Sequence, residues 1–188
     1  MELLIIGLGL WCAAHLFPSV AADHRSRLIS RLGLGTYKLL FSLSILIAIT
    51  LIVLGWRSMT PSQIYNPPVW GRHVTMLLVL LTFYLFAVAR SKSNIKRILR
   101  HPQLSGLLLW SIGHLLANGD SRSLLLFPVM FIWALLEMYC INRRQGPWQK
   151  PPSVAIGTEF VTAVKGLVLY TVFLFAHPYL TGMPLIHF

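Results

Sequence analysis

Two histidines, His15 and His114, lie well inside long apolar stretches of the sequence, where an ionisable side chain is costly to bury. Each has an aromatic residue and a residue with a small thiol or hydroxyl group on its own helical face, four and three positions earlier. These neighbours are Trp11 and Cys12 for the first histidine, and Trp110 and Ser111 for the second. Two inward-facing imidazoles from different helices can clamp a flat macrocycle such as haem between axial nitrogens. His15 and His114 are therefore candidate metal ligands of a haem site.

Other interpretations of this pattern stay open. A lone intramembrane histidine often hydrogen-bonds a neighbouring helix, and small residues often serve close helix packing. The small residues near the two histidines are Gly7, Gly9, Gly106 and Gly113. A zinc site is disfavoured, because no further cysteine or carboxylate is expected at that depth to complete four ligands.

A second group of polar residues, Arg100-His101-Pro102, precedes the apolar stretch that contains His114. Proline fits the first turn of a helix, so His101 is expected at the N-cap beside unpaired backbone N–H groups. A helix start with Arg97 and Arg100 nearby suits an anion such as a haem propionate, a phosphate or a carboxylate. The competing interpretation is an ordinary helix start at the membrane interface.

The same stretch ends in Asn118-Gly119-Asp120. We expect Gly119 to end the helix in a left-handed conformation and Asp120 to cap the next helix. Asn118 stands four residues after His114 and is a candidate to orient that ring. A plain turn is the simpler account of the three residues.

Six long apolar runs must position these side chains. Hydrophobic residues make up 56% of the 188 residues and charged residues only 11%, and a helix needs about 20 mostly apolar residues to cross a bilayer. The runs are 3–22, 39–56, 74–89, 103–119, 123–140 and 166–177 with its tail. The sequence predicts an all-α polytopic membrane bundle of six transmembrane helices, forming a single domain over residues 1–188. The last helix is expected to begin early, near Ser153, with Thr158 and Glu159 lying along the interface.

Thirteen of the sixteen basic residues fall in three of the predicted loops, all on one side of the membrane. They are Arg25, Arg27, Arg31 and Lys38; Arg90, Lys92, Lys96, Arg97 and Arg100; and Arg143, Arg144, Lys150 and Lys165. The opposite side holds Arg57, Arg72 and Arg122. Because Lys and Arg in short loops stay cytoplasmic, both termini are predicted on the periplasmic side. The net charge of +11 is then explained by membrane lipid headgroups, and no nucleic-acid partner is expected.

Several kinds of chemistry are disfavoured. The five acidic residues, Glu2, Asp23, Asp120, Glu137 and Glu159, all fall at or near predicted helix ends. Paired-carboxylate catalysis and carboxylate metal cages are therefore not expected. The sequence has no glycine-rich phosphate loop and no Cys-x-x-Cys pair, and its two cysteines cannot build a disulfide framework.

The stretch from Arg100 to Asp120, RHPQLSGLLLWSIGHLLANGD, resembles the NnrU family of membrane proteins almost letter for letter. Supporting pieces are His15, the segment 67–73 (PPVWGRH), Arg143-Arg144 and the segment 177–180 (HPYL), so the similarity runs nearly end to end. The resemblance implies a multi-pass protein of a bacterial inner membrane with a role in denitrification and nitric-oxide metabolism. Relatives of that family, the zeta-carotene isomerases, bind haem b through histidines. Carried onto this chain, the axial ligands would be His15 and His114, with Ser111 where the isomerases have a cysteine.

Three functional hypotheses follow. The first is a haem b protein which, if it is an enzyme, resembles a haem-dependent cis–trans isomerase with an isoprenoid substrate. The second is an S-adenosylmethionine-dependent membrane methyltransferase, because Arg-His-Pro-x-Leu-x-Gly resembles the cofactor motif of isoprenylcysteine carboxyl methyltransferases and would use His101, Gly106 and Arg143-Arg144. The third is a non-enzymatic accessory factor of a respiratory reductase.

Overall fold

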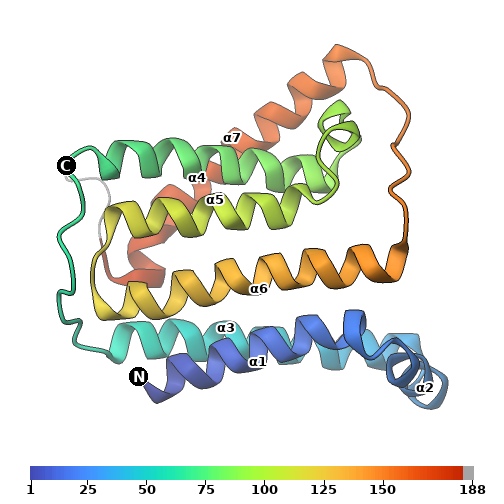
Figure 1. The fold of residues 1–188 in the computed structure, drawn as a ribbon, viewed down its shortest axis with the longest axis horizontal. Coiled ribbons are helices and arrows are strands. Elements are labelled where there is room, and N and C mark those ends of the chain that lie inside the picture. Colours follow the sequence, from blue (N-terminus) through green and yellow to red (C-terminus); the bar gives the residue numbers. More distant parts are fainter. Residues whose placement is uncertain (184–188) are drawn as a thin grey trace. The chain divides into compact units, whose positions relative to one another are not determined.

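The computed structural model describes residues 1–183, and every regular element in that range is a helix (Figure 1). The elements are α1 (Glu2–Val20), α2 (Ala22–Leu32), α3 (Leu34–Ser58), α4 (Gly71–Arg90), the 3-10 helix η1 (Asn94–Arg97), α5 (Pro102–Ala117), α6 (Ser121–Gln145) and α7 (Ile156–Thr181). The predicted all-α fold is confirmed. The tail after residue 183, which belongs to the last predicted run, lies outside the described residues.

Five of these helices, α1, α3, α4, α6 and α7, are long and apolar enough to cross a membrane. The chain is therefore a multi-pass membrane protein. The remaining predicted span corresponds to α5, which has 16 residues and is about 24 Å long at 1.5 Å per residue. It is shorter than the other five.

The chain divides into two compact units, and each is described by itself. The first consists of Met1–Thr60 and Tyr139–Gly146, and the second of Pro61–Met138 and Pro147–Phe188. The long helix α6 contributes residues to both.

In the first unit, α1 and α3 pack side by side (Figure 1). Glycines make the close approach possible: a Cβ atom on Gly7 would lie 2.8 Å from the backbone nitrogen of Ile52. A Cβ atom on Gly55 would collide with the backbone of Leu4. Gly7 thus serves helix packing, as small residues do in membrane bundles.

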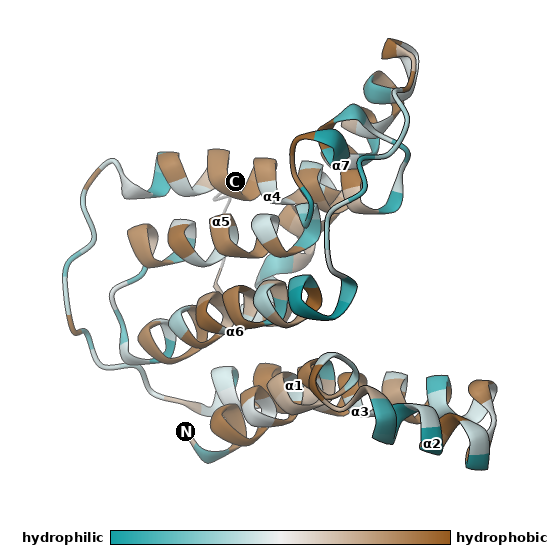
Figure 2. Ribbon diagram, turned by 45° about the vertical axis from the view of Figure 1, so that its right-hand side comes forward, coloured by the Kyte–Doolittle hydropathy of each residue, from teal (hydrophilic) through white to brown (hydrophobic). Residues whose placement is uncertain are grey.

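Helix α2 was missed by the search for apolar runs, which predicted a loop there. Its sequence, ADHRSRLISRL, is mostly polar with a few apolar residues at helical spacing, and it appears as a largely hydrophilic helix in Figure 2. Arg25 lies over the ring of Tyr37 at 5.5 Å from the centroid, and Gly33, with φ +80°, ends the helix. This pattern is typical of amphipathic helices that lie at a membrane surface.

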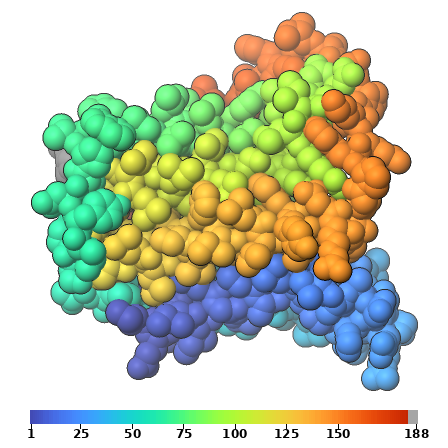
Figure 3. Space-filling view, viewed as in Figure 1, coloured from blue at the N-terminus to red at the C-terminus, as the bar shows by residue number. Residues whose placement is uncertain are grey.

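In the second unit, α4 packs against both α5 and α7. Two threonines of α4 join it to α5: Thr75 Oγ1 lies 2.5 Å from the carbonyl oxygen of Gly113, and Thr82 Oγ1 lies 2.9 Å from that of Gly106. Because both threonines and both glycines are seven residues apart, the contacts repeat once every two turns. The atoms of the two helices lie against each other in Figure 3. Gly106 and Gly113 are therefore packing residues as well.

Helix α7 crosses α4 where Gly166 meets the backbone of Tyr84, and a Cβ atom there would lie 2.7 Å from the Tyr84 Cα. The rings of Phe83 and Phe173 add a contact with centroids 4.9 Å apart. The early start of this helix is confirmed, at Ile156 rather than near Ser153, and Lys165 lies inside the helix rather than in the preceding loop.

Glu159 of α7, which the sequence predicts along the interface, is bound by residues that follow α4. Its carboxylate accepts hydrogen bonds from Ser93 Oγ at 2.9 Å and from the backbone nitrogen of Asn94. The Asn94 side chain in turn pairs with the backbone of Val154 through two hydrogen bonds of 2.9 Å. These bonds fix the segment before α5 to the start of α7.

Candidate functional site

The imidazole of His114 is held on two sides by protein groups in the second unit. Its Nδ1 lies 2.8 Å from the carbonyl oxygen of Trp110, one turn earlier on α5. Because a carbonyl oxygen can only accept, Nδ1 must carry the proton, which leaves the Nε2 lone pair for a ligand. The Phe127 ring of α6 stacks on the imidazole, with centroids 4.6 Å apart, and Trp110 lies 4.8 Å from it. Sequence reasoning missed Phe127, because nothing in the spacing relates it to His114.

Ser111 lies one turn before His114 and is fully buried. Its hydroxyl oxygen has no hydrogen-bond partner among the described residues. A buried polar group without a partner is uncommon and costs free energy. The position therefore suits a bound molecule that brings a polar atom, and the donor set around His114 fits a haem-type ligand.

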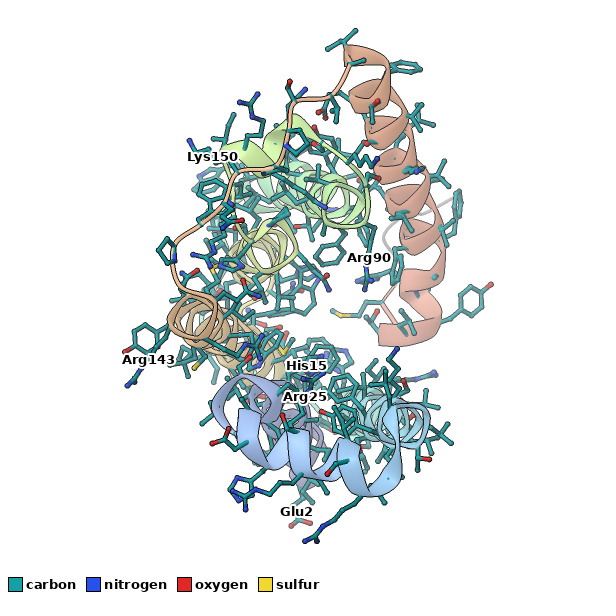
Figure 4. The ribbon with its side chains drawn as sticks, turned by 90° about the vertical axis from the view of Figure 1, so that its right-hand side faces the viewer. Glu2, His15, Arg25, Arg90, Arg143 and Lys150 are labelled. Atoms are coloured by element: carbon teal, nitrogen blue, oxygen red, sulfur yellow. The ribbon has the colours of Figure 1, made fainter. Side chains whose placement is uncertain are left out.

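His15 belongs to the first unit and has a closely similar anchor. Its Nδ1 lies 3.0 Å from the carbonyl oxygen of Trp11, whose ring is 4.2 Å away, and Phe41 of α3 makes an edge contact at 5.7 Å. Figure 4 shows His15 among the side chains of this unit. Cys12, the thiol on the same helix face, is half-buried and forms no disulfide. Since His15 and His114 lie in different units, their pairing on one iron stays a prediction.

His177 is a further anchored histidine and was not among the candidate ligands predicted from the sequence. It lies within α7, and its Nδ1 is 2.9 Å from the carbonyl oxygen of Met183. Thr181 Oγ1 lies 3.2 Å from the same nitrogen. Gly182, with φ +75°, lets the chain turn back so that Met183 reaches the ring.

The start of α5 is formed as predicted. His101 is the N-cap residue and Pro102 occupies the first helical turn, although the His101 side chain makes no capping hydrogen bond. Near this start, a shallow cavity of about 310 Å³ is lined by Asn94, Arg97, Ile98 and Lys150; Figure 4 labels Lys150 in this part of the chain. Two cationic side chains thus share one depression, which is suited to an anionic group.

The turn after α5 differs from the prediction in two respects. Gly119 is not left-handed, because Gly33, Gly146 and Gly182 are the positive-φ residues of the described chain. Glycine is required instead by close approach, since a Cβ atom there would collide with the carbonyl of Tyr65. The amide of Asn118 donates to the His114 backbone carbonyl at 2.9 Å and does not orient the ring.

Asp120 caps α6 as predicted. Its carboxylate accepts hydrogen bonds from the backbone nitrogens of Arg122 and Ser123, at 3.0 and 3.2 Å, and from Ser123 Oγ at 2.8 Å. Burial raises the pKa of this carboxyl, but the hydrogen bonds from Ser123 and Arg122 outweigh it and hold the pKa below its ordinary value.

Tyr65 was also missed by sequence reasoning. Its hydroxyl donates to the carbonyl oxygen of Asn118 at 2.9 Å and to that of Leu115, so it satisfies the open carboxyl end of α5. Burial and the charge of Asp120 raise the pKa of this phenol, which therefore stays protonated and able to donate.

Glu137 does not lie at a helix end as predicted. It stands eight residues before the end of α6 and is 8% exposed. The sequence interpretation had placed the end of this helix near Cys140, because the apolar run stops there. A buried carboxyl inside a membrane-spanning helix is commonly functional.

The residues of the methyltransferase hypothesis are not brought together within either unit. Gly106 is packed on α4, where a Cβ atom would lie 3.1 Å from the Phe86 ring and from the Thr82 carbonyl oxygen. Arg143 and Arg144 belong to the first unit, in which Arg144 donates to the carbonyl of Pro18 at 2.6 Å. Gly106 thus packs against α4, which leaves no room for a cofactor at this position.

Comparison with known proteins gives one match. The family model described as NnrU protein matches residues 3–185, which is nearly the whole chain and spans both compact units. No curated protein and no solved structure matches the chain.

Proposed function

The chain belongs to the NnrU family, and on that premise we propose that it is a haem b protein of a bacterial inner membrane. His114 would supply one axial nitrogen and His15 the other. The observation that carries the proposal is the His114 imidazole, whose Nδ1 is tied to Trp110 so that Nε2 is left as a ligand atom. Metal-binding histidines usually have such a second bond, which fixes the tautomer and the ring orientation.

The surroundings of His114 support a bound macrocycle. Trp110 and Phe127 give the site apolar aromatic walls, and the buried Ser111 hydroxyl needs a polar partner that the described protein does not offer. Bound haem would supply an iron centre able to bind nitric oxide, to polarise a double bond or to carry an electron. The protein's own contribution is to fix the imidazole and to keep water away from it.

We infer a role in nitric-oxide metabolism during denitrification from the family likeness. The second candidate is isomerisation of an isoprenoid, which the apolar walls formed by Trp110 and Phe127 favour. An accessory role beside a respiratory reductase is compatible with haem binding, and co-purification with such a complex without independent turnover would identify it.

The proposal is tested by purifying the full chain in detergent and titrating it with haemin. A Soret band with a low-spin spectrum is expected for the wild type, and His114→Ala should abolish most of it. His73→Ala is the matched control, because His73 is exposed at the start of α4. A folded wild-type protein that takes up no haemin would overturn the proposal.

The same purified protein tests the methyltransferase alternative. Calorimetric titration with S-adenosylmethionine and with its demethylated product is expected to give no heat of binding. A saturable isotherm that His101→Ala removes would favour the methyltransferase over the haem protein.

We further propose that α5 is a sixth membrane span and that both termini are periplasmic. Although short, α5 runs along α4 from the level of Gly71 to that of Phe86, which is most of that helix. The positive-inside bias supports the orientation. Single cysteines placed at Ser62 and Gln149 in a Cys12→Ser, Cys140→Ser background should be labelled from the periplasm and the cytoplasm respectively. The reverse pattern would contradict the topology.

Anionic membrane lipids are the partners proposed for the basic side. Arg97 and Lys150 share the cavity beside η1, and juxtamembrane basic residues each contribute about 1 kcal/mol to attraction by an anionic surface. Arg100 and His101 stand at the start of α5, about 20 Å along the helix from His114 at 1.5 Å per residue, which is too far to reach a propionate of haem held by His114. They would instead add to the anion-binding surface beside η1, so Arg100→Gln should weaken binding to anionic lipid vesicles and leave haemin affinity unchanged.

A further inference from the structure

We propose that His177 on α7 belongs to the same site as His114 and can supply the second axial imidazole from within one compact unit. The inference rests on the proposed haem function and concerns which residues hold the iron. His177 was not predicted as a ligand from the sequence, where it belongs to the segment 177–180 of the family resemblance.

The packing on α4 brings the two histidines to the same end of the second unit. Gly113, the neighbour of His114, lies against Thr75 near the start of α4. Helix α7 runs antiparallel to α4, because Glu159 binds Ser93 beyond the end of α4 and Gly166 meets Tyr84. The later residues of α7 therefore lie toward the start of α4, where His114 is.

His177 also points in the required direction. It stands four residues after Phe173, which contacts Phe83 of α4, and residues four apart share a helix face. His177 is thus directed at the helix pair that carries His114.

Both rings present the same nitrogen. His114 Nδ1 is bound to the Trp110 carbonyl and His177 Nδ1 to the Met183 carbonyl. Within residues 1–183, neither Nε2 atom takes part in a hydrogen bond. Each imidazole thus keeps an unprotonated Nε2 atom, so the two rings offer the two nitrogen ligands that a metal centre with two axial histidines requires.

The anchor of His177 is more elaborate than a lipid-facing histidine requires. Thr181 donates to the His177 carbonyl at 2.9 Å and accepts from the Met183 nitrogen at 3.0 Å, which holds the Met183 carbonyl in place. A short turn at Gly182 is thus used to fix one ring. Such supporting hydrogen bonds are typical of ligands that must keep a defined orientation.

The test compares His15→Ala, His177→Ala and the double variant, each titrated as the full-length protein in detergent with haemin and examined by electron paramagnetic resonance. His15→Ala is expected to retain a low-spin signal, because His177 fills the vacated position. The double variant should become high-spin and bind haemin at least tenfold more weakly. Added imidazole should restore its low-spin signal, and His73→Ala should match the wild type.

Two results would overturn the inference while leaving the proposed function intact. One is a high-spin signal in His15→Ala alone; the other is a double variant that stays low-spin with unchanged haemin affinity. Absence of a Soret band in the folded wild type would instead overturn the proposed function, and this inference with it. Circular dichroism on each variant distinguishes loss of a ligand from loss of the fold. Thr181→Val, which loosens the His177 ring without removing it, should weaken haemin binding in the His15→Ala background.

Discussion

The imidazole of His114 lies stacked on the ring of Phe127, with centroids 4.6 Å apart and planes inclined by 27°. The two residues come from α5 and α6, which are joined by the turn that Asp120 caps. The orientation of the candidate ligand therefore depends on how these two helices pack, as well as on its own helix.

Replacing Phe127 tests this dependence. Phe127→Ala should leave the His114 ring free to tilt and should lower haemin affinity several-fold, while Phe127→Leu, which keeps most of the bulk, should have a smaller effect. Phe175→Ala is the control, because Phe175 is 56% exposed on α7. Equal haemin affinity in Phe127→Ala and the wild type would show that stacking does not position the ligand.

The two threonine bonds between α4 and α5 should contribute measurably to stability. Thr75→Val and Thr82→Val each keep the side-chain shape but remove the hydroxyl, whose single proton is shared between the α5 carbonyl and a carbonyl of α4 itself, Gly71 for Thr75 and Leu78 for Thr82. An interhelical hydrogen bond in membrane proteins is worth about 0.6 kcal/mol on average and up to about 1.7. The unfolding temperature measured in detergent should therefore be lower for each variant than for the wild type. Thr171→Val should be neutral, because that exposed hydroxyl bonds only to its own helix at Leu167.

Close packing at Gly106 should not tolerate a larger side chain. Gly106→Val would force its added atoms against the Phe86 ring and the Thr82 carbonyl, both 3.1 Å from a Cβ position, and overpacking costs about 1–3 kcal/mol. We expect a lower unfolding temperature and weaker haemin binding, because α5 moves away from α4. Gly157→Ala, where nothing lies within 4 Å of the added Cβ, should be neutral or slightly stabilising.

The cap at Asp120 should make stability depend on pH in the acid range. Because the folded pKa lies below the ordinary value of 3.8, the carboxylate stabilises the fold fully above that value. This contribution is lost as the pH falls through the folded pKa. Asp120→Ala should lose about 0.5–2 kcal/mol at neutral pH, the range for a helix cap. Unfolding temperatures measured from pH 7 to pH 3 should decline more steeply below pH 4 for the wild type than for the variant; parallel curves would contradict the assignment.

Most helices could be found from the sequence, because a membrane-spanning helix must be apolar along most of its length. Helix α2 was missed for the converse reason: most of its residues are polar, so its mean hydropathy is low although its few apolar residues recur at helical spacing. Glu137 was misplaced because the apolar run ends before the helix does.

The residues of the candidate site also fall into two groups, those that could be found from the sequence and those that could not. Trp110 and Ser111 were found because helical spacing puts them on the face of His114 or one turn from it, and the Asp120 cap follows from residue order alone. Phe127, Tyr65 and His177 come from other elements, so no spacing along the chain points to them. Gly119 was correctly predicted at the end of α5, but glycine is needed there for close approach to Tyr65 rather than for a left-handed conformation. Tyr65 is 54 residues away along the chain, so the sequence gives no sign of this contact.

The sequence by itself determined that the chain is helical and apolar, roughly where its long apolar helices lie, and that histidines lie inside them, because these properties depend on residues close together in the chain. Only the tertiary structure decided which glycines serve packing and which ring covers His114. These depend on the angles and registers at which helices meet, and such contacts between distant segments have no period along the sequence.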